Sequence, residues 1–286
     1  MSQDLQSRYR AWRLNPSKDL VLTRLLATRF SGPVRDYFRR LDAAGLRVTT
    51  YDAANARLID RLVANGGNFW PDSGAFCAMA GYSFPTAGTL IPLKDGHDAG
   101  TLNAFVSGDW NAVTGLKGDG DEKYVDSNRS NLISINDNAF GAFLDSYQSN
   151  NIAHLIMGAR GVESTGSDQI IGNFGNTAGQ NRMISKGIGF NPTPSSVGGY
   201  FGVSRNTDTN FTARSDRTNT TGPTTVSQTP VGSNFFVFAR SEDTTPNVFT
   251  DARIMLYHIG PNLNGTGELA ELDAILTDWQ THLANA

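Results

Sequence analysis

The chain has 286 residues, 39% of them hydrophobic, with 30 glycines and a net charge of −3, which predicts a globular, turn-rich protein. Its single cysteine, Cys77, excludes an intramolecular disulfide and a metal site of several cysteines, and predicts a buried thiol in a reducing compartment. No window approaches about 18 continuous apolar residues, and the N-terminus lacks the apolar stretch of a signal peptide. We therefore expect neither membrane insertion nor secretion.

The charge is unevenly distributed along the chain. Residues 1–70 hold 12 Lys and Arg against 6 Asp and Glu, whereas residues 71–286 hold 12 against 21. A basic segment joined to an acidic body predicts docking on a negative partner, which could be nucleic acid, a membrane surface or an acidic protein. The alternative is that these arginines are ordinary solvent-exposed helix residues.

Residues 1–67 show the apolar periodicity of three short helices. Ser17 can cap the first helix, Pro33 opens the second, Thr49 or Thr50 begins the third, and a glycine stands near the end of each. The apolar stripes are too narrow to keep such short helices stable alone. We predict a helical attachment arm, residues 1–67, that packs on the rest of the molecule or on another chain.

The remainder of the chain is expected to be an irregular connection, residues 68–109, followed by a β body, residues 110–286. Strand signals recur about every 8 to 15 residues without helices between them, which favours an antiparallel sandwich or jelly roll and excludes a parallel α/β sheet. The predicted strands are 132–135, 141–147, 153–159, 169–174, 182–190, 200–205, 210–214, 224–229, 234–241 and 252–259.

The body closes with one amphipathic helix, predicted over residues 267–284. Its apolar residues recur at helical spacing, and Glu268 and Glu271 stand in the first turn, where the helix dipole favours acids. Such an apolar face requires cover, so we expect the helix to lie against the final strand of the sandwich.

A glycine and aspartate turn in the segment Gly115–Asn128 stands between apolar residues, which predicts a tight hairpin. With this pattern the sequence resembles the concanavalin A-like, laminin-G-like jelly rolls of tailed-bacteriophage structural proteins. Those proteins also end with a strand, a loop and a short helix. The residues here that match this ending are Arg253, Tyr257, Ile259, Gly260, Leu269, Leu272 and Asp273. The resemblance covers about residues 50–67 and 88–286.

The resemblance implies a mainly β fold: an antiparallel, concanavalin A-like jelly-roll sandwich with an N-terminal helical arm and a C-terminal amphipathic helix. It further implies a virion structural protein made in the host cytoplasm, and among these we favour a tail fibre or receptor-binding component that contacts host surface glycan. A head-decorating or minor capsid protein is the alternative, and a polysaccharide-degrading enzyme is the second alternative. We expect other virion proteins as partners and a homo-oligomer, taken as a trimer, with no specific nucleic acid.

Two groups of residues are the candidates for binding. Assembly on the particle is assigned to basic and aromatic residues of the arm, namely Arg8, Arg10, Trp12, Arg13, Arg35, Arg39 and Arg40. Ligand binding is assigned to three aromatic residues that could stack on sugars, Trp110, Tyr147 and Tyr200. The alternative for these rings is burial between the sheets or under a loop.

Catalytic and metal sites are not predicted. The acidic turn from Asp119 to Asp126 lacks the ligand spacing of a calcium loop, and a solvated turn is favoured over a calcium site. The four histidines show no metal-ligand spacing, and no array of paired carboxylates lies on one strand. We therefore expect no cofactor and a protein that is not an enzyme.

Overall fold

The computed structural model describes residues 30–66, 69–147, 154–161, 166–172, 181–192, 198–215, 217–222, 226–230, 232–263 and 265–286. Its helices are α3 (Gly32–Ala43), α4 (Asp52–Asn65) and α5 (Gly265–Ala284), with short 3₁₀ turns η2 (Thr49–Tyr51) and η4 (Ser107–Asp109). Pro33 is the second residue of α3 and favours its first turn, because its ring sets the helical φ where no backbone donor is needed. The first predicted helix lies outside the described residues.

The strands form two sheets. Sheet A has the order β13 (Thr218–Thr221), β12 (Thr212–Ser215), β11 (Gly199–Arg205), β6 (Asn138–Ser146), β17 (Arg253–Gly260), β4 (Gly115–Lys117) and β3 (Trp110–Asn111), with β1 (Ala75–Ala78) also paired to β17. Sheet B has the order β10 (Ile188–Phe190), β9 (Arg182–Ser185), β8 (Asp168–Gly172), β7 (His154–Arg160), β14 (Asn234–Val237), β5 (Tyr124–Ser130) and β2 (Thr101–Asn103). A hairpin of β15 (Arg240–Glu242) and β16 (Thr245–Asn247) joins sheet B beside β7.

Apart from the parallel contact of β15 with β7, the strand pairings are antiparallel. The predicted mainly β, antiparallel jelly-roll sandwich with N-terminal helices and one C-terminal amphipathic helix is therefore confirmed. Strand β17 is central in its sheet, because β6 pairs with one edge while β1 and β4 pair with the other. Among the described residues, no helix is long and apolar enough to cross a membrane.

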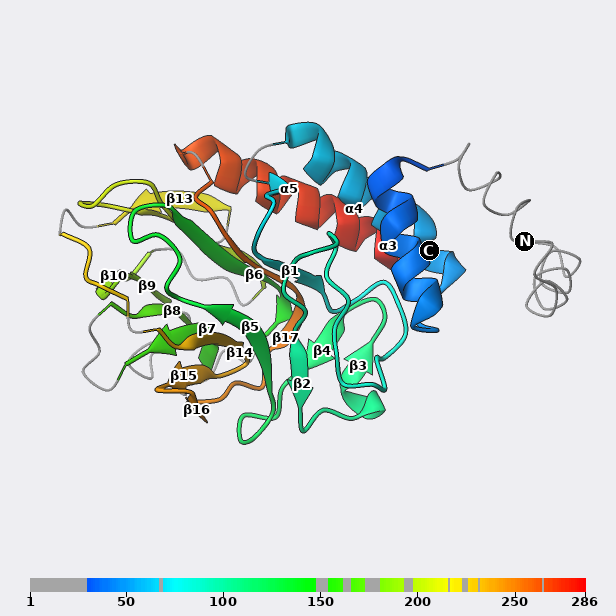
Figure 1. Cartoon of the computed structure of the whole chain (residues 1–286), viewed down its shortest axis with the longest axis horizontal. Coiled ribbons are helices and arrows are strands. Elements are labelled where there is room, and N and C mark those ends of the chain that lie inside the picture. Colours follow the sequence, from blue (N-terminus) through cyan, green and yellow to red (C-terminus); the bar gives the residue numbers. More distant parts are fainter. Residues whose placement is uncertain are drawn as a thin grey trace, which may run out of the picture.

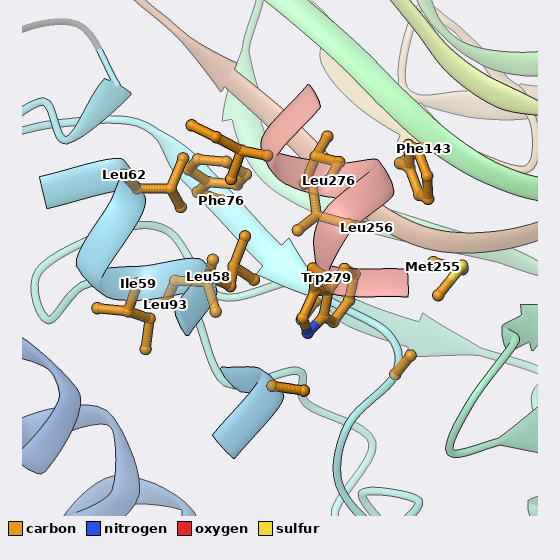
Figure 2. Close-up of a cluster of buried hydrophobic side chains, with 14 of the residues drawn as sticks. Leu58, Ile59, Leu62, Phe76, Leu93, Phe143, Met255, Leu256, Leu276 and Trp279 are labelled. Carbon is orange, nitrogen blue, oxygen red and sulfur yellow. The ribbon is translucent and has the colours of Figure 1, made fainter. Parts of the chain in front are cut away.

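The apolar side chains gather in two cores. One core fills the space between the sheets, and the other lies between sheet A and the three helices, which stand together on one side of the strands (Figure 1). Trp279 of α5 is fully buried in this second core, beside Leu58 of α4 and Leu256 of β17 (Figure 2). Its indole Nε1 donates to Oδ1 of Asn55 at 3.1 Å, which ties α5 to α4.

The boundaries of several predicted strands are corrected by the structure. Residues 132–135 form turns, with Leu132 64% exposed, and residues 226–229 are not strand. The long strand predicted at 182–190 is the hairpin β9–β10, folded at Lys186 and Gly187, which both have positive φ. The strand predicted at 234–241 is broken at Phe238, where φ is +70°. The hairpin predicted within Gly115–Asn128 is wrong, because β4 belongs to sheet A and β5 to sheet B, and the glycine turn crosses from one sheet to the other. The connection over 68–109 contributes β1 to sheet A and β2 to sheet B.

Candidate functional site

A polar groove opens between α5 and the edge of sheet A that carries the β12–β13 turn. It consists of two adjoining cavities of about 320 and 480 Å³, which share Arg217, Asp273 and Thr277. Pockets that hold small ligands are typically ~300–1,000 Å³. We call it the α5 groove. Its other described lining residues are Arg61, Phe143, Leu144, Asp145, Gly198, Gly199, Tyr200, Arg214, Ala270, Ala274, Asp278, Gln280 and Thr281.

An ion pair stands at the centre of the groove and joins α5 to sheet A. Nε of Arg214, on β12, donates to Oδ2 of Asp273, on α5, at 2.8 Å, and both side chains are almost fully buried. Arg214 also donates to Oδ1 of Asn219 at 2.8 Å, and the Thr277 hydroxyl donates to Oδ1 of Asp273 at 3.4 Å. Asn219 thus holds Arg214 and Thr277 holds Asp273, so the ion pair fixes α5 against sheet A and is not itself free for a ligand.

A tyrosine and a histidine form a buried pair beneath the groove. The hydroxyl of Tyr200 lies 2.6 Å from Nε2 of His258, and the two rings stack. Both residues are buried, and burial lowers the pKa of His258 to about 3 and raises that of Tyr200. Gly141 leaves the space that this pair occupies, because a Cβ there would lie 2.7 Å from both the Tyr200 hydroxyl and His258 Nε2.

The charges that line the groove compensate one another, except for two. Arg214 pairs with Asp273, and Nη1 of Arg61 lies 3.4 Å from Oδ2 of Asp278. Arg217 has no hydrogen bond or ion pair with any residue that the structure describes, and it is exposed. Asp145 is half-buried and accepts at Oδ2 from the Ser146 hydroxyl at 3.3 Å. One cation and one anion therefore remain to face a ligand.

The aromatic residues predicted to bind ligand do not form an exposed platform. Tyr200 is 1% and Tyr147 5% exposed, and Tyr147 donates its hydroxyl to Asn181 between the sheets. Trp110 is half-buried, packs on Tyr82 and donates to the Tyr82 carbonyl at 3.0 Å. This expectation is corrected: the rings are held by the cores, which large apolar surfaces favour, and only Tyr200 lines the α5 groove.

The arginines predicted for assembly divide into two groups. Arg8, Arg10, Trp12 and Arg13 lie outside the described residues. Arg35, Arg39 and Arg40 lie on α3, where Arg40 turns toward the body and donates to the carbonyls of Pro92 and Leu93. Arg35 donates to the Phe30 carbonyl, and Arg39 is exposed beside Asp36. Of these three, only Arg39 presents its guanidinium mainly to solvent.

The acidic turn directs its first carboxylate toward its own backbone. Oδ1 of Asp119 accepts from the backbone N–H groups of residues 121, 122 and 123 at 3.0–3.1 Å, which helps lower the pKa of Asp119 despite the opposing effect of burial. Within the described ranges, no group of three or more His, Cys, Asp or Glu is placed to hold a metal ion.

Cys77 is buried, which raises its pKa to about 11.

The uncompensated charges of the groove follow no sequence motif. Arg217 stands in the turn between two short, threonine-containing strands, and Asp145 near the end of β6. Of the lining residues, the sequence indicates only Asp273, as part of the closing motif, and Tyr200, as a candidate for sugar stacking. The available signal was the interval between two short strands, which predicts a hairpin turn but not what the turn faces.

Comparison with known proteins finds similarity in structure only. No protein-family model matches the sequence, and no curated protein matches it. A mutant of Trypanosoma rangeli sialidase that displays trans-sialidase activity is 12% identical, with a TM-score of 0.48, over 82% of this chain and 38% of that one. Domain 4 of a GH43 extracellular arabinanase from Geobacillus stearothermophilus, in complex with arabinotriose, is 10% identical, with a TM-score of 0.39, over 55% of this chain and 75% of that domain.

A third similar structure is the NanB sialidase from Streptococcus pneumoniae, 10% identical with a TM-score of 0.38, over 48% of this chain and 24% of that one. This chain thus spans well under half the length of the sialidases. The prediction that the chain is not an enzyme is corrected on this comparison, because several of the structures that it resembles are sialidases. At these identities and TM-scores, no catalytic residue or substrate carries over to this chain.

Proposed function

We propose that this chain binds a glycan, and that the α5 groove is its binding site. The observation that carries the proposal is the combination of volume and lining: two adjoining cavities of about 320 and 480 Å³ are lined by arginine, aspartate, threonine and glutamine side chains. Sugars present many hydroxyl groups, which need donors and acceptors placed close together. Guanidinium groups supply donors only, carboxylates supply acceptors only, and Thr277 and Gln280 supply both.

The lining favours a sugar over an apolar ligand. Phe143 and Leu144 line only one end of the groove, and both are almost fully buried. An apolar molecule in the groove would remove water from the guanidinium of Arg217 and the carboxylate of Asp145 without replacing their hydrogen bonds. Such uncompensated desolvation costs ~1–3 kcal/mol for each group, and more where the group is charged. A polyol replaces those hydrogen bonds.

The biological setting that we propose is the surface of a tailed-bacteriophage particle, as a receptor-binding or tail-fibre component. The glycine- and aspartate-rich segment Gly115–Asn128 and the closing strand and helix support this setting, since they carry the resemblance to phage structural proteins. Electron micrographs of the particle labelled with an antibody against this chain test it. Label at the tail supports the proposal, label in a regular array on the head favours the decorating alternative, and unlabelled particles contradict both.

Glycan binding is tested with the purified full chain on a panel of bacterial surface polysaccharides and their oligosaccharides. We expect binding that is lost when a bulky side chain is placed in the groove by Gln280→Trp. Leu132→Trp, at an exposed turn position that does not line the groove, is the control and should bind like the unchanged chain. Absence of binding across a panel that includes the host's own polysaccharide would contradict the proposal. Chain length of the bound polymer, followed in the same assay, reports hydrolysis.

A further inference from the structure

Two features of the α5 groove together specify its ligand more closely, and the inference that follows rests on the proposed glycan binding. The first is the pair of charges left uncompensated, Arg217 and Asp145, which line the same cavity. The second is the backbone conformation that holds Arg217 there.

Arg217 occupies a backbone conformation that an arginine disfavours. It is the second residue of the two-residue turn between β12 and β13, where Ser215 pairs with Thr218, and its φ is +61°. Glycine or asparagine adopts this left-handed conformation with much less strain, and both are the common choices in such turns. Strained residues of this kind are concentrated at functional sites. The turn aims an exposed cation at the groove at a cost to stability.

Asp145 lines the same cavity as Arg217, and its half-buried carboxylate remains accessible there. Gly198 lies against the backbone of Asp145, since a Cβ at Gly198 would stand 2.6 Å from its carbonyl oxygen. At the neighbouring Gly199 a Cβ would meet no atom within 4 Å, so this part of the wall is open. The Ser146 hydroxyl occupies Oδ2 of Asp145, which leaves Oδ1 to accept hydrogen bonds.

We propose that the groove selects an uncharged sugar with adjacent free hydroxyl groups, held between Arg217 as donor and Asp145 as acceptor. A carboxylate accepts from two neighbouring hydroxyls, and a guanidinium donates to hydroxyl or ring oxygens, so the two charges compensate one another across a neutral ligand. An acidic sugar would bring its charge near the Asp145 carboxylate, and a cationic ligand would bring its charge near the Arg217 guanidinium, while the other charges of the groove are already paired. Like charges at close range disfavour both.

The test separates the role of the Arg217 side chain from its effect on folding. Arg217→Gly removes the guanidinium and relieves the left-handed strain, so we expect Tm to stay equal or rise while the affinity for a neutral oligosaccharide falls by about tenfold or more. Thr244→Gly is the matched control, because Thr244 is the second residue of the β15–β16 turn, has φ +71° and is exposed. It should raise Tm without changing the affinity.

Calorimetric titration with neutral oligosaccharides and with their uronic-acid or sialic-acid counterparts decides the ligand class. We expect the neutral sugars to bind at least about tenfold more tightly, and Asp145→Asn to weaken them by a similar factor. If the unchanged chain binds sugars but Arg217→Gly binds them equally well, or if acidic sugars bind more tightly, this inference is overturned while glycan binding stands. If no sugar binds, the proposed function and this inference fail together.

Discussion

Two polar clusters in this molecule contain the same type of ion pair in different surroundings. In the α5 groove, Arg214 and Asp273 are 2.8 Å apart, in a cavity open to solvent. At the side of sheet B that carries the β9–β10 turn, Nζ of Lys186 lies 2.8 Å from Oδ2 of Asp168, and both side chains are 0% exposed. We call Lys186, Asp168 and Asn131 the lysine cluster.

The polar groups of the lysine cluster form hydrogen bonds with one another. Lys186 Nζ also donates to the Asn131 carbonyl at 2.9 Å, and the backbone N–H of Lys186 donates to Oδ1 of Asp168 at 2.9 Å. Among the described residues of the groove, neither Arg217 nor Asp145 has a partner of opposite charge. A buried ion pair whose groups are all satisfied therefore gives no sign of a ligand, whereas uncompensated charges beside a cavity are candidates for binding one.

The largest expected effect is on the lysine cluster. Asp168→Asn leaves the Lys186 ammonium buried without its counter-charge, so the free energy of unfolding should fall by ~3–5 kcal/mol. Urea denaturation measures the loss. The double variant Asp168→Leu with Lys186→Met should recover only part of it, because no charge then remains buried but the Lys186 backbone N–H and the Asn131 carbonyl lose their partners. Sugar binding by the folded fraction should not change; reduced binding would mean that the two clusters are coupled.

A smaller effect is expected from Gly141→Ala, beneath the groove. The added Cβ would lie 2.7 Å from the Tyr200 hydroxyl and from His258 Nε2, and 2.8 Å from the Phe201 carbonyl, so overpacking should cost ~1–3 kcal/mol. Gly267→Ala on α5 is the control, since a Cβ there meets nothing within 4 Å and a helical alanine is favoured by ~0.5–1 kcal/mol over glycine. Equal stabilities of the two variants would contradict the packing described for Tyr200 and His258.

The stability should also depend on pH through His258. Burial lowers its folded pKa to about 3 from the ordinary 6.5, so the unfolded chain takes up the proton first as pH falls. The contribution of His258 is complete above pH 6.5 and is lost by up to ~1.4 kcal/mol for each pH unit below it. His258→Gln should flatten the unfolding profile between pH 6.5 and the range where carboxylates titrate. Parallel profiles for the two proteins would contradict this assignment.

The smallest effect is expected on the surface of α3. Arg39 lies 2.6 Å from Asp36, but 77% of its side chain is exposed. An exposed pair of this spacing contributes ~0.5 kcal/mol or less, so Arg39→Ala should change the unfolding free energy by no more than that. If the chain is part of a phage particle, as proposed, and Arg39 docks on a neighbouring protein there, the same variant should weaken incorporation into particles at unchanged stability. Incorporation at the level of the unchanged chain would remove Arg39 from the docking residues.

The fold was predictable because its signals are local. Alternating apolar residues bounded by turns predicted β17 to within one residue at each end, and the helical period predicted α5 to within two. The exceptions have non-local or conformational causes. The short strand β1 is fixed by its pairing with β17, which lies far along the chain. The strand breaks at Phe238 because this residue has a positive φ, which phenylalanine rarely adopts and which the sequence does not indicate.

The candidate site was not predictable for a related reason. Asp145, Arg217 and Asp273 come from β6, the β12–β13 turn and α5, and only the folded sheet brings them together. The aromatic residues chosen from the sequence, Tyr147 and Tyr200, have the right chemistry for stacking on sugars but are buried in the cores. The type of a side chain predicts what it can bind. Whether it does bind depends on its exposure, and exposure is set by tertiary packing.

The position of β17 has a consequence for how the protein is made. This strand pairs with β6, β1 and β4 in the middle of sheet A, yet it leaves the ribosome after every other strand of that sheet. Until it emerges, β6 and β1 have no neighbour between them, and the apolar face that α5 covers stays open. Sheet A therefore cannot be completed before β17 has emerged, and the many contacts between distant parts of the sequence predict slow folding.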